Sequence, residues 1–488
     1  MPATPHTPAI AGAAQVIQRP GEQPLDAARG PIELMVAAAH AAAADAGAPS
    51  LLGKVGWIGV VPGWYRFNDP GAIVAEQLGC PGAHTARSAI SGTAAQDLLG
   101  LACARIAAGE LDVALVLGGE ARWSSVRLKR DGREPAWRQD DTTSTPELVS
   151  GFPDEMLTEM SVLGSAAAAY ALFEDRLRSA AGETPAAHAA RIAELWAGFS
   201  AVAEHNPYAW DRTPHSADAI RTPTPTNRMI VHPYTKAMVA NNTVDMGSAI
   251  LVCSAEAARA AGVPADRLVY PQVVTHGHET WCAAARRELH QSPALAAAGH
   301  AAFAHAGVGP DQIDHVDLYA CFPAIVQMSS AALGLATDRP LTLTGGLGFA
   351  GAPIANAVGH ALAAMVPLAR CGGWALIHGN GGSATKQSFG IYRNEPPAAG
   401  FADIDVQDDV DLAPRDVLPD DWSGACTIEA ATVVHDREGP AKLLAAVLDE
   451  RGARAWSTSP DLGLCEQAAT AGVDGLAAQR TSDGELLV

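Results

Sequence analysis

The sequence is short of basic residues and aromatic residues, and it has no long uninterrupted apolar run. Its 488 residues include 33 Lys or Arg against 53 Asp or Glu, which gives a net charge of −20. Nucleic acids and anionic membranes select basic surfaces, so this balance argues against both as partners. No apolar stretch reaches about 18 residues without a charge, so no membrane span is expected.

Cysteine is present but not in paired patterns. The eight cysteines are scattered, and none forms a Cys-x-x-Cys pair or a Cys/His cluster with zinc spacing. We therefore expect reduced, buried thiols and no metal site. The N-terminus lacks the basic segment and cleavage pattern of a signal peptide. Together these features lead us to expect a cytoplasmic protein.

Aliphatic residues, alanine above all, are abundant, and their order predicts an α/β fold. In the first part we expect strands at 9–17, 55–61 and 113–118, and helices at 29–47 and 91–109. Continuous apolar strands that alternate with helices favour a mainly parallel sheet covered on both faces.

The second part of the chain repeats the first in outline. Val113-Ala-Leu-Val-Leu-Gly-Gly119 and Trp374-Ala-Leu-Ile-His-Gly-Asn-Gly381 occupy equivalent places, so we infer a duplicated α/β unit with five strands in each half. In this second part the expected strands are 268–275, 314–322 and 374–382, and the expected helices are 294–307, 323–334 and 354–370 around a glycine loop at 344–353. A further strand, expected at 249–253, belongs to the first part.

Two stretches fit neither half. Residues 122–231 carry two expected helices (162–180 and 184–205) and a Pro-rich loop, so we interpret them as an inserted loop domain. After a linker at 394–400, residues 401–488 hold short strand-like pieces with the spacing of a small β-barrel, and we expect a separate domain there. This division leaves 1–121 with 232–265 as the N-terminal half and 266–393 as the C-terminal half.

A series of motifs runs in a fixed order along the chain. Arg87-Ser88-Ala89-Ile90-Ser91-Gly92 leads into a helix, a strand and Gly118-Gly-Glu120. Later motifs are Asn206-Pro-Tyr-Ala-Trp210, Pro233-Tyr-Thr-Lys236, Asp317-Leu-Tyr-Ala-Cys-Phe322, Gly345-Gly346…Gly351-Ala-Pro353 and Gly379-Asn-Gly381. With these motifs, residues 5 to 393 resemble the thiolase superfamily, which includes the acetyl-CoA acetyltransferases. The resemblance is closest to the sterol-carrier-protein-type thiolases and the actinobacterial type-1 thiolase-like proteins.

The resemblance implies a duplicated five-layer thiolase fold with a helical loop domain and a small, β-barrel-like (OB-like) C-terminal domain. It also implies a coenzyme A thioester as ligand or substrate, with no covalently bound cofactor. The family makes or breaks a C–C bond next to that thioester. The reaction needs a cysteine thiolate, a histidine that activates it, an acid/base for the α-proton, and oxyanion holes.

The side chains for this chemistry are replaced. Carried onto this sequence, the nucleophile position is Ala89 and the histidine of the Gly-His-Pro motif is Ala352. The Asn or His that shapes an oxyanion hole is Tyr319, and the second cysteine is Ile377. Four replacements together put cysteine-dependent thiolase activity in doubt.

Backbone groups and a helix end do not depend on side-chain identity. The N–H groups of Ala89 and Gly379 are expected to form the remaining oxyanion hole. The helix after Ser91 would keep its positive N-terminal end toward the pocket, with Ser91 as its cap.

Four polar residues near the same pocket are candidates for catalysis. Tyr319 is a proton donor or base, or else a satisfied buried hydroxyl. His360 and His378 are general bases, or structural histidines bonded to backbone. Cys321 is a nucleophile, or core packing beside an aromatic residue.

Basic residues in the inserted segment are candidates for the ligand's phosphates. Arg127 and Arg130 belong to a short cluster that either meets coenzyme A or is a solvated face. Three functions stay open: an acyltransferase by family, an aldolase-type C–C lyase on a CoA thioester with Tyr319 as base, and a non-catalytic acyl-CoA-binding or scaffold protein. The expected assembly is a monomer or a homodimer.

Overall fold

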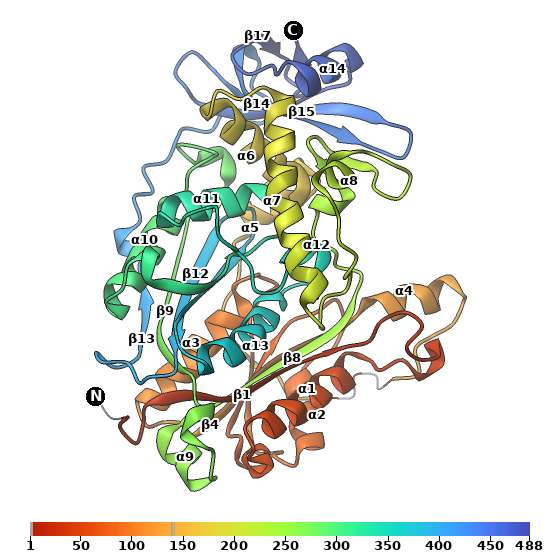
Figure 1. Cartoon of the computed structure of the whole chain (residues 1–488). Coiled ribbons are helices and arrows are strands. Elements are labelled where there is room, and N and C mark those ends of the chain that lie inside the picture. The colour runs from red at the N-terminus through yellow and green to blue at the C-terminus, as the bar shows by residue number, and fades with distance from the viewer. Residues whose placement is uncertain (1–2, 138–139, 141) are drawn as a thin grey trace.

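The computed structural model describes residues 3–137, 140 and 142–488, and it shows a mixed α/β protein with three sheets (Figure 1). The first sheet has the order β1-β8-β4-β2-β3-β5 and the second β10-β11-β12-β9-β13. The first comprises Pro8–Ile17, Asp245–Ser254, Val113–Ala121, Trp57–Val61, His84–Arg87 and Glu147–Leu148. The second comprises Ile313–Asp317, Trp374–Gly381, Lys386–Arg393, Tyr270–His278 and Ala402–Asp405.

The duplication expected from the sequence is present in the strand order. The neighbours β1-β8-β4-β2 of the first sheet correspond to β9-β12-β11-β10 of the second. The first sheet has six strands instead of the expected five, because the short β5 from the inserted segment pairs with β3 at the sheet edge. The second sheet reaches five strands only through β13, which pairs in parallel with β9.

The expected mainly parallel strand direction is present in both core sheets, apart from one antiparallel strand in each. In each half the strands β8 and β12 run antiparallel to both of their neighbours. The reason is local in the second half, where only residues 382–385 separate β11 from β12. A connection this short can make a hairpin but cannot make the crossover that parallel strands need. The parallel pairs that remain include β2 with β3 and β4, and β10 with β11.

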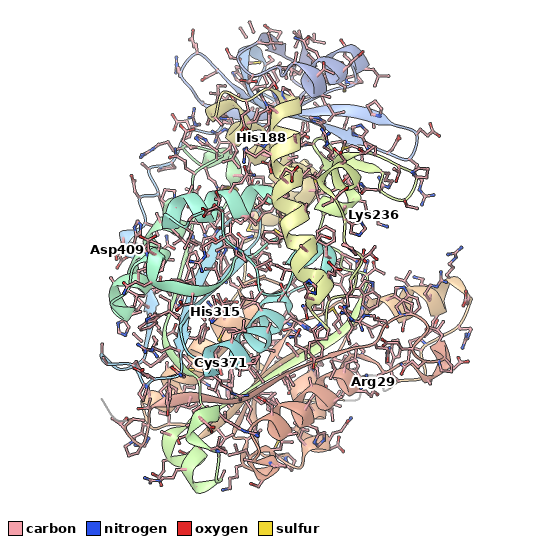
Figure 2. All side chains as sticks on the ribbon, in the orientation of Figure 1. Arg29, His188, Lys236, His315, Cys371 and Asp409 are labelled. Atoms are coloured by element: carbon pink, nitrogen blue, oxygen red, sulfur yellow. The ribbon has the colours of Figure 1, made fainter. Side chains whose placement is uncertain are left out.

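Helices form three layers around the two sheets. α1 (Pro31–Asp45) covers the outer face of the first sheet, and α10 (Pro293–Ala306) covers the outer face of the second. α3 (Ala94–Ala107) and α13 (Ala357–Arg370) contact strands of both sheets and therefore form the central layer. Buried apolar side chains fill the space between the layers (Figure 2).

The remaining helices belong to the outer layers, the inserted segment and the terminal part. The expected helix 184–205 is confirmed as α7, which Thr184 caps by accepting the Ala187 N–H. The expected helix 162–180 starts later, as α6, because Gly164 (φ 76°) ends α5 before it. The bounds of these remaining helices are α2 Pro70–Leu78, α4 Arg122–Arg130, α5 Asp154–Leu163, α6 Ala166–Ala180, α7 Pro185–His205, α8 Ala217–Arg221, α9 Ala255–Ala260, α11 Pro323–Leu333, α12 Gly346–Phe349 and α14 Leu462–Thr470.

The third sheet contains most of the terminal segment, and it lies at the top of Figure 1. Its order is β16-β15-β14-β17-β18, and one bridge from Thr458 to Glu485 brings the two ends of that order together. Residues 402–405 were expected in this unit but form β13 of the second core sheet. Two short strands from other parts of the chain join the third sheet: β6, at the end of the inserted segment, pairs with β14, and β7, just after that segment, pairs with β6. The OB-like topology stays a prediction. The bounds are Arg454–Ser459, Pro440–Leu448, Gly424–His435, Ala477–Arg480 and Leu486–Leu487 for the main order, and Met229–Val231 and Tyr234–Thr235 for β6 and β7.

In the described part of the chain, each helix on its own is too short or too polar to span a membrane. The helices Asp154–Leu163 and Ala166–Ala180 are long and apolar enough for a span only when they are taken together, and they meet at a 79° bend.

Candidate functional site

The elbow that carries the family resemblance connects β3 to α3. β3 ends at Arg87, and α3 begins only at Ala94, so Thr93 takes the cap position that we expected for Ser91. Ser91 instead pairs its hydroxyl with that of Thr93 at 2.8 Å. The Thr93 hydroxyl then donates to Asp97 in the first turn of the helix. A six-residue loop, 88–93, therefore precedes the helix.

The end of β11 lies directly on this elbow. A Cβ on Gly379 would stand 3.2 Å from the Gly92 carbonyl oxygen. A Cβ on Gly92 would collide with the Asn380 carbonyl oxygen and would stand 2.5 Å from the Tyr319 hydroxyl. Glycine at both positions thus allows strand and elbow to touch, and the contact leaves no gap for a thioester between them.

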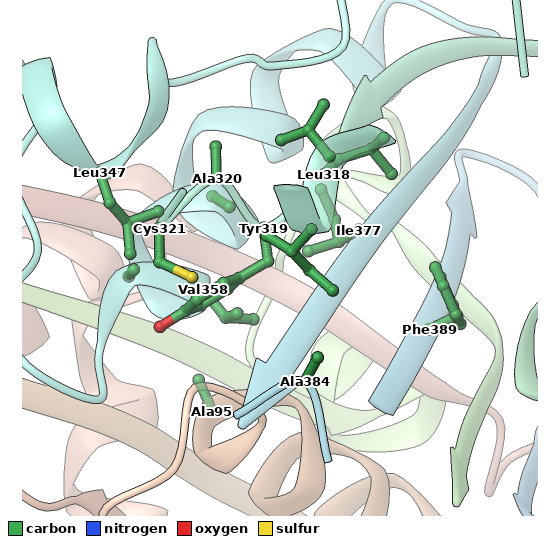
Figure 3. Packing of buried hydrophobic residues seen from close by; sticks show 14 of the residues in the cluster. Ala95, Leu318, Tyr319, Ala320, Cys321, Leu347, Val358, Ile377, Ala384 and Phe389 are labelled. Carbon is green, nitrogen blue, oxygen red and sulfur yellow. The ribbon is translucent and has the colours of Figure 1, made fainter. Parts of the chain in front are cut away.

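Tyr319 closes the remaining space beside the elbow. It follows β10, it is 8% exposed, and Figure 3 shows its ring beside Cys321 and Val358. Burial, with a smaller contribution from Cys321, raises the pKa of the Tyr319 hydroxyl far above its ordinary value. Among the described residues that hydroxyl has no hydrogen-bond partner. Tyr319 is therefore an un-ionised phenol that fills space.

The cavity next to Tyr319 is very small. Its volume of about 10 Å³ is what a single water molecule needs. Polar groups from distant parts of the chain meet in it, so a bound water is chemically reasonable. The small volume leaves no room for an acyl group. The polar lining residues are Gln15, Asn206, Tyr208, Asp317, Tyr319, Thr344 and His360.

His360 lines this cavity from α13. Its Nδ1 lies 2.9 Å from Gln15 Oε1, and since that oxygen can only accept, Nδ1 carries the hydrogen. Nε2 is buried and has no partner in the described part of the protein. Burial lowers the pKa of His360 to about 3. The histidine thus presents a bare lone pair to the cavity, but it is a weak base.

His378 points away from the cavity and holds the backbone of Tyr319. Its Nε2 donates to Gln387 Oε1 at 2.9 Å, and its Nδ1 accepts the Tyr319 N–H at 3.3 Å. The ring is fully buried and stacks on Phe389. Burial lowers the pKa of His378 to about 4, so the ring stays neutral near pH 7.

The low pKa of His378 predicts a loss of stability in acid. Between about pH 6.5 and pH 4 the unfolded chain binds a proton that the folded chain refuses, so stability falls as pH falls through that window. At about pH 5 this one residue accounts for about 2 kcal/mol. We expect His378→Gln to lose about 2 kcal/mol less unfolding free energy than wild type between about pH 7.5 and about pH 5.

Urea unfolding at the two pH values measures this difference, and His300→Gln is the matched control because His300 is exposed. Equal losses in wild type and His378→Gln would show that His378 is protonated in the folded protein.

Cys321 is not an activated thiol. Burial raises its pKa to about 12, and the Asn380 side-chain amide lies 3.9 Å from its sulfur. Asn380 is in turn bonded to the Tyr170 hydroxyl and to Gln387, which leads back to His378. Sequence reasoning missed this buried network and the Gln15 partner of His360. The one signal in the sequence was Gln15, a glutamine in the otherwise apolar strand β1.

The other family positions do not converge on the Tyr319 cavity. Ala89 lines a second cavity, on the other side of the elbow, and its N–H donates to the Ser150 carbonyl at 3.1 Å. That bond leaves the Ala89 N–H no free hydrogen for an oxyanion. Ala352 donates its N–H to Asn241, and the Ile377 carbonyl accepts from Gln96. Gly379, the second expected donor, packs on the elbow.

Arg127 and Arg130 are exposed on α4, which lies at the edge of the molecule, away from α13 (Figure 1). The Arg127 guanidinium lies over the Trp123 ring, 5.7 Å from its centroid. Neither residue lines the Tyr319 cavity. Among the described residues no group of three or more His, Cys, Asp or Glu could hold a metal ion, and all eight cysteines are free.

Comparison with known proteins identifies relatives by structure. No family model and no curated protein matches the sequence. A monomeric SCP2-thiolase-like protein type 1 from Mycobacterium smegmatis matches with 30% identity and a TM-score of 0.84, over 100% of both chains.

More distant structures share the fold. The Ltp2-ChsH2(DUF35) aldolase is 19% identical with a TM-score of 0.61, over 80% of this chain and 99% of that one. An acetyl-CoA acetyltransferase from Syntrophomonas wolfei is 16% identical with a TM-score of 0.55, over the same shares.

Proposed function

The chain belongs to the thiolase superfamily as an SCP2-thiolase-like protein, and from this premise we propose that it binds an acyl-CoA thioester without thiolase turnover. The observation that carries the proposal is the position of Tyr319. Its hydroxyl stands where a side chain on Gly92 would be, and the cavity beside it holds about one water. A thioester carbonyl therefore has no space beside Tyr319, the family position that shapes an oxyanion hole.

The two catalytic alternatives lack the groups that they need. An acyltransferase needs a thiolate, but Ala89 has no thiol and the pKa of Cys321 is raised to about 12. An aldolase-type lyase needs a base with a pKa near the working pH. Tyr319 is held un-ionised by burial, and the pKa of His360 is lowered to about 3. Neither side chain supports proton abstraction from a β-hydroxyacyl-CoA.

Coenzyme A as the ligand class follows from the family, with no covalently bound cofactor. We keep Arg127 and Arg130 as the proposed contacts for its phosphates, because an exposed guanidinium is free to bind a phosphate in bidentate fashion. The bulk of such a ligand would lie outside the Tyr319 cavity. We propose further that the protein is a monomer or a homodimer. No role is proposed for the terminal β-rich unit.

The replacement Ala89→Cys tests whether the missing thiol is the only defect. We expect no thiolysis of acetoacetyl-CoA by free CoA in the variant, as in wild type, because residue 89 faces a different cavity from Tyr319 and His360. The assay follows the loss of the acetoacetyl-CoA absorbance. Thiolysis by wild type, or its appearance on this single change, would overturn the proposal.

Calorimetric titration with acetyl-CoA tests the binding half of the proposal. We expect a micromolar dissociation constant for wild type, and weaker binding for an Arg127→Met/Arg130→Met variant. A dissociation constant above roughly 1 mM, worth only about 4 kcal/mol, would remove coenzyme A as the ligand class.

A further inference from the structure

The cavity on the Ala89 side of the elbow has features of its own. It has a volume of about 290 Å³, against about 10 Å³ for the cavity at Tyr319. It lies between the end of β2 and the loop after it, the end of β3, and β5. Its lining residues are Val60, Pro62, Gly63, Tyr65, Phe67, Pro70, Arg87, Ser88, Ala89, Ile90 and Leu148.

The walls of this cavity are apolar and aromatic. Tyr65 and Phe67 meet edge to face with ring centroids 5.4 Å apart. At the rim, Ile90 is 49% exposed and Leu148 is 64% exposed. The Tyr65 hydroxyl is engaged with the Val61 carbonyl at 3.3 Å. Large apolar side chains at the mouth of a hollow usually mark a surface that something else covers.

Arg87 is the single charged residue among those that line the cavity. It is half-buried, and within the described ranges its guanidinium has neither a hydrogen bond nor a carboxylate at ion-pair distance. Two buried acids, Glu120 near the end of β4 and Asp69 just before α2, have other partners. Glu120 accepts the Trp64 and Ala121 N–H groups, and Asp69 accepts from Thr85, Ser144 and the Ala72 N–H.

Within the described residues, Arg87 is thus an unpaired cation in a largely apolar hollow. The protein has a net charge of −20, so acidic residues were available to pair Arg87. A guanidinium offers two parallel N–H donors, which match the two oxygens of one carboxylate. Arg87 is the one cation among the lining residues. A ligand group that matches its charge therefore carries a single negative charge.

We propose that this cavity binds a carboxylic acid with an apolar body of about ten heavy atoms, its carboxylate on Arg87 and its chain against Tyr65, Phe67 and Ile90. A medium-chain fatty acid has this chemistry. The site is separate from the Tyr319 cavity and needs neither coenzyme A nor turnover. The inference therefore goes beyond the proposed function and can fail or hold independently of it.

Calorimetric titration of the full chain with decanoate tests the assignment, and decanol, of equal chain length without charge, is the ligand control. We expect saturable one-to-one binding of decanoate and at least about tenfold weaker binding of decanol. Arg87→Met, which keeps side-chain length and removes the charge, should weaken decanoate binding by about tenfold or more. Arg66→Met is the matched control, since Arg66 is exposed in the adjoining loop and does not line the cavity.

A second variant guards against a folding defect at Arg87. Ala89→Phe places a ring in the cavity while the guanidinium stays, and it should also abolish decanoate binding with an unchanged melting temperature. Equal binding of decanol and decanoate, or undiminished binding in both Arg87→Met and Ala89→Phe, would overturn the site. Loss of acetyl-CoA binding in the separate titration would overturn only the proposed function.

Discussion

Replacing Arg454 by methionine is expected to lower the free energy of unfolding by about 3–5 kcal/mol and to loosen the terminal sheet from the core. Arg454 lies in β16 and is fully buried. Its Nε and Nη2 donate to the two oxygens of Glu429 at 2.6 and 2.7 Å. The loss of the guanidinium would leave a buried carboxylate without its partner, which is among the costliest single changes in a protein interior.

The same guanidinium fastens two units of the chain together. Its Nη1 donates to the carbonyl oxygens of Ala283, Ala284 and Arg286, and its Nη2 donates to that of Arg287. These carbonyls belong to the segment after β9 of the second core sheet, so one side chain joins that segment to the third sheet. We expect Arg454→Met to increase proteolytic cleavage between residues 394 and 423, which connect the two units.

Chemical unfolding and limited proteolysis measure the two effects. The control is Arg451→Met, because Arg451 is exposed three residues away and should change stability by no more than about 0.5 kcal/mol. Adding Glu429→Met to Arg454→Met should recover part of the loss, since no unpaired charge then remains buried. A double variant less stable than Arg454→Met alone would show that Glu429 is satisfied without Arg454.

The sequence predicted this fold well because its signals are periodic and long. Apolar strands such as Val113–Ala121 and capped helices such as Pro185–His205 extend over many residues, so errors at single positions do not change the element. The pairing of strands is less local. The expectation of a mainly parallel sheet did not include the antiparallel strands β8 and β12. For β12 the sequence does contain the signal, because its four-residue connection to β11 permits only a hairpin.

The candidate site was harder to predict because it depends on contacts between distant residues. Tyr319 belongs to one of the family motifs, and His360 and His378 follow or precede two others, but whether these side chains face a cavity depends on packing. His378 turns to Gln387 nine residues later, whereas His360 turns to Gln15 at the other end of the chain. No sequence pattern distinguishes these two outcomes. Arg454 shows the same limit, since its short strand reads as surface and its partner Glu429 lies 25 residues away.

Arg87 is the first residue of the elbow motif, and nothing in the sequence indicates a role for it. Alternation along β3 places Thr85 and Arg87 on the same side of the strand. Thr85 donates to Asp69, whereas Arg87 has no such partner among the described residues. The absence of a partner is a three-dimensional property, and so the cavity beside Arg87 became visible only in the structure.

Removing the Tyr319 ring is expected to have the second large effect. Tyr319→Ala should cost about 3–5 kcal/mol of unfolding free energy, because it leaves a ring-sized cavity between the elbow and the end of β11. Tyr319→Phe should cost no more than about 1 kcal/mol, since the hydroxyl has no hydrogen-bond partner among the described residues and loses at most a bound water. Urea unfolding of the two variants gives both values.

The pair of Tyr319 variants also separates a space-filling residue from a catalytic one. If Tyr319 only fills space, the ring carries the effect and the hydroxyl is dispensable, so Tyr319→Phe should retain wild-type stability and acetyl-CoA binding. A catalytic phenol gives the opposite result, because Tyr319→Phe would then abolish cleavage of a β-hydroxyacyl-CoA that wild type performs. Such cleavage would require a proton acceptor that burial denies to both Tyr319 and His360. The larger loss of unfolding free energy in Tyr319→Ala than in Tyr319→Phe and the absence of turnover in wild type are therefore two consequences of the same packed ring.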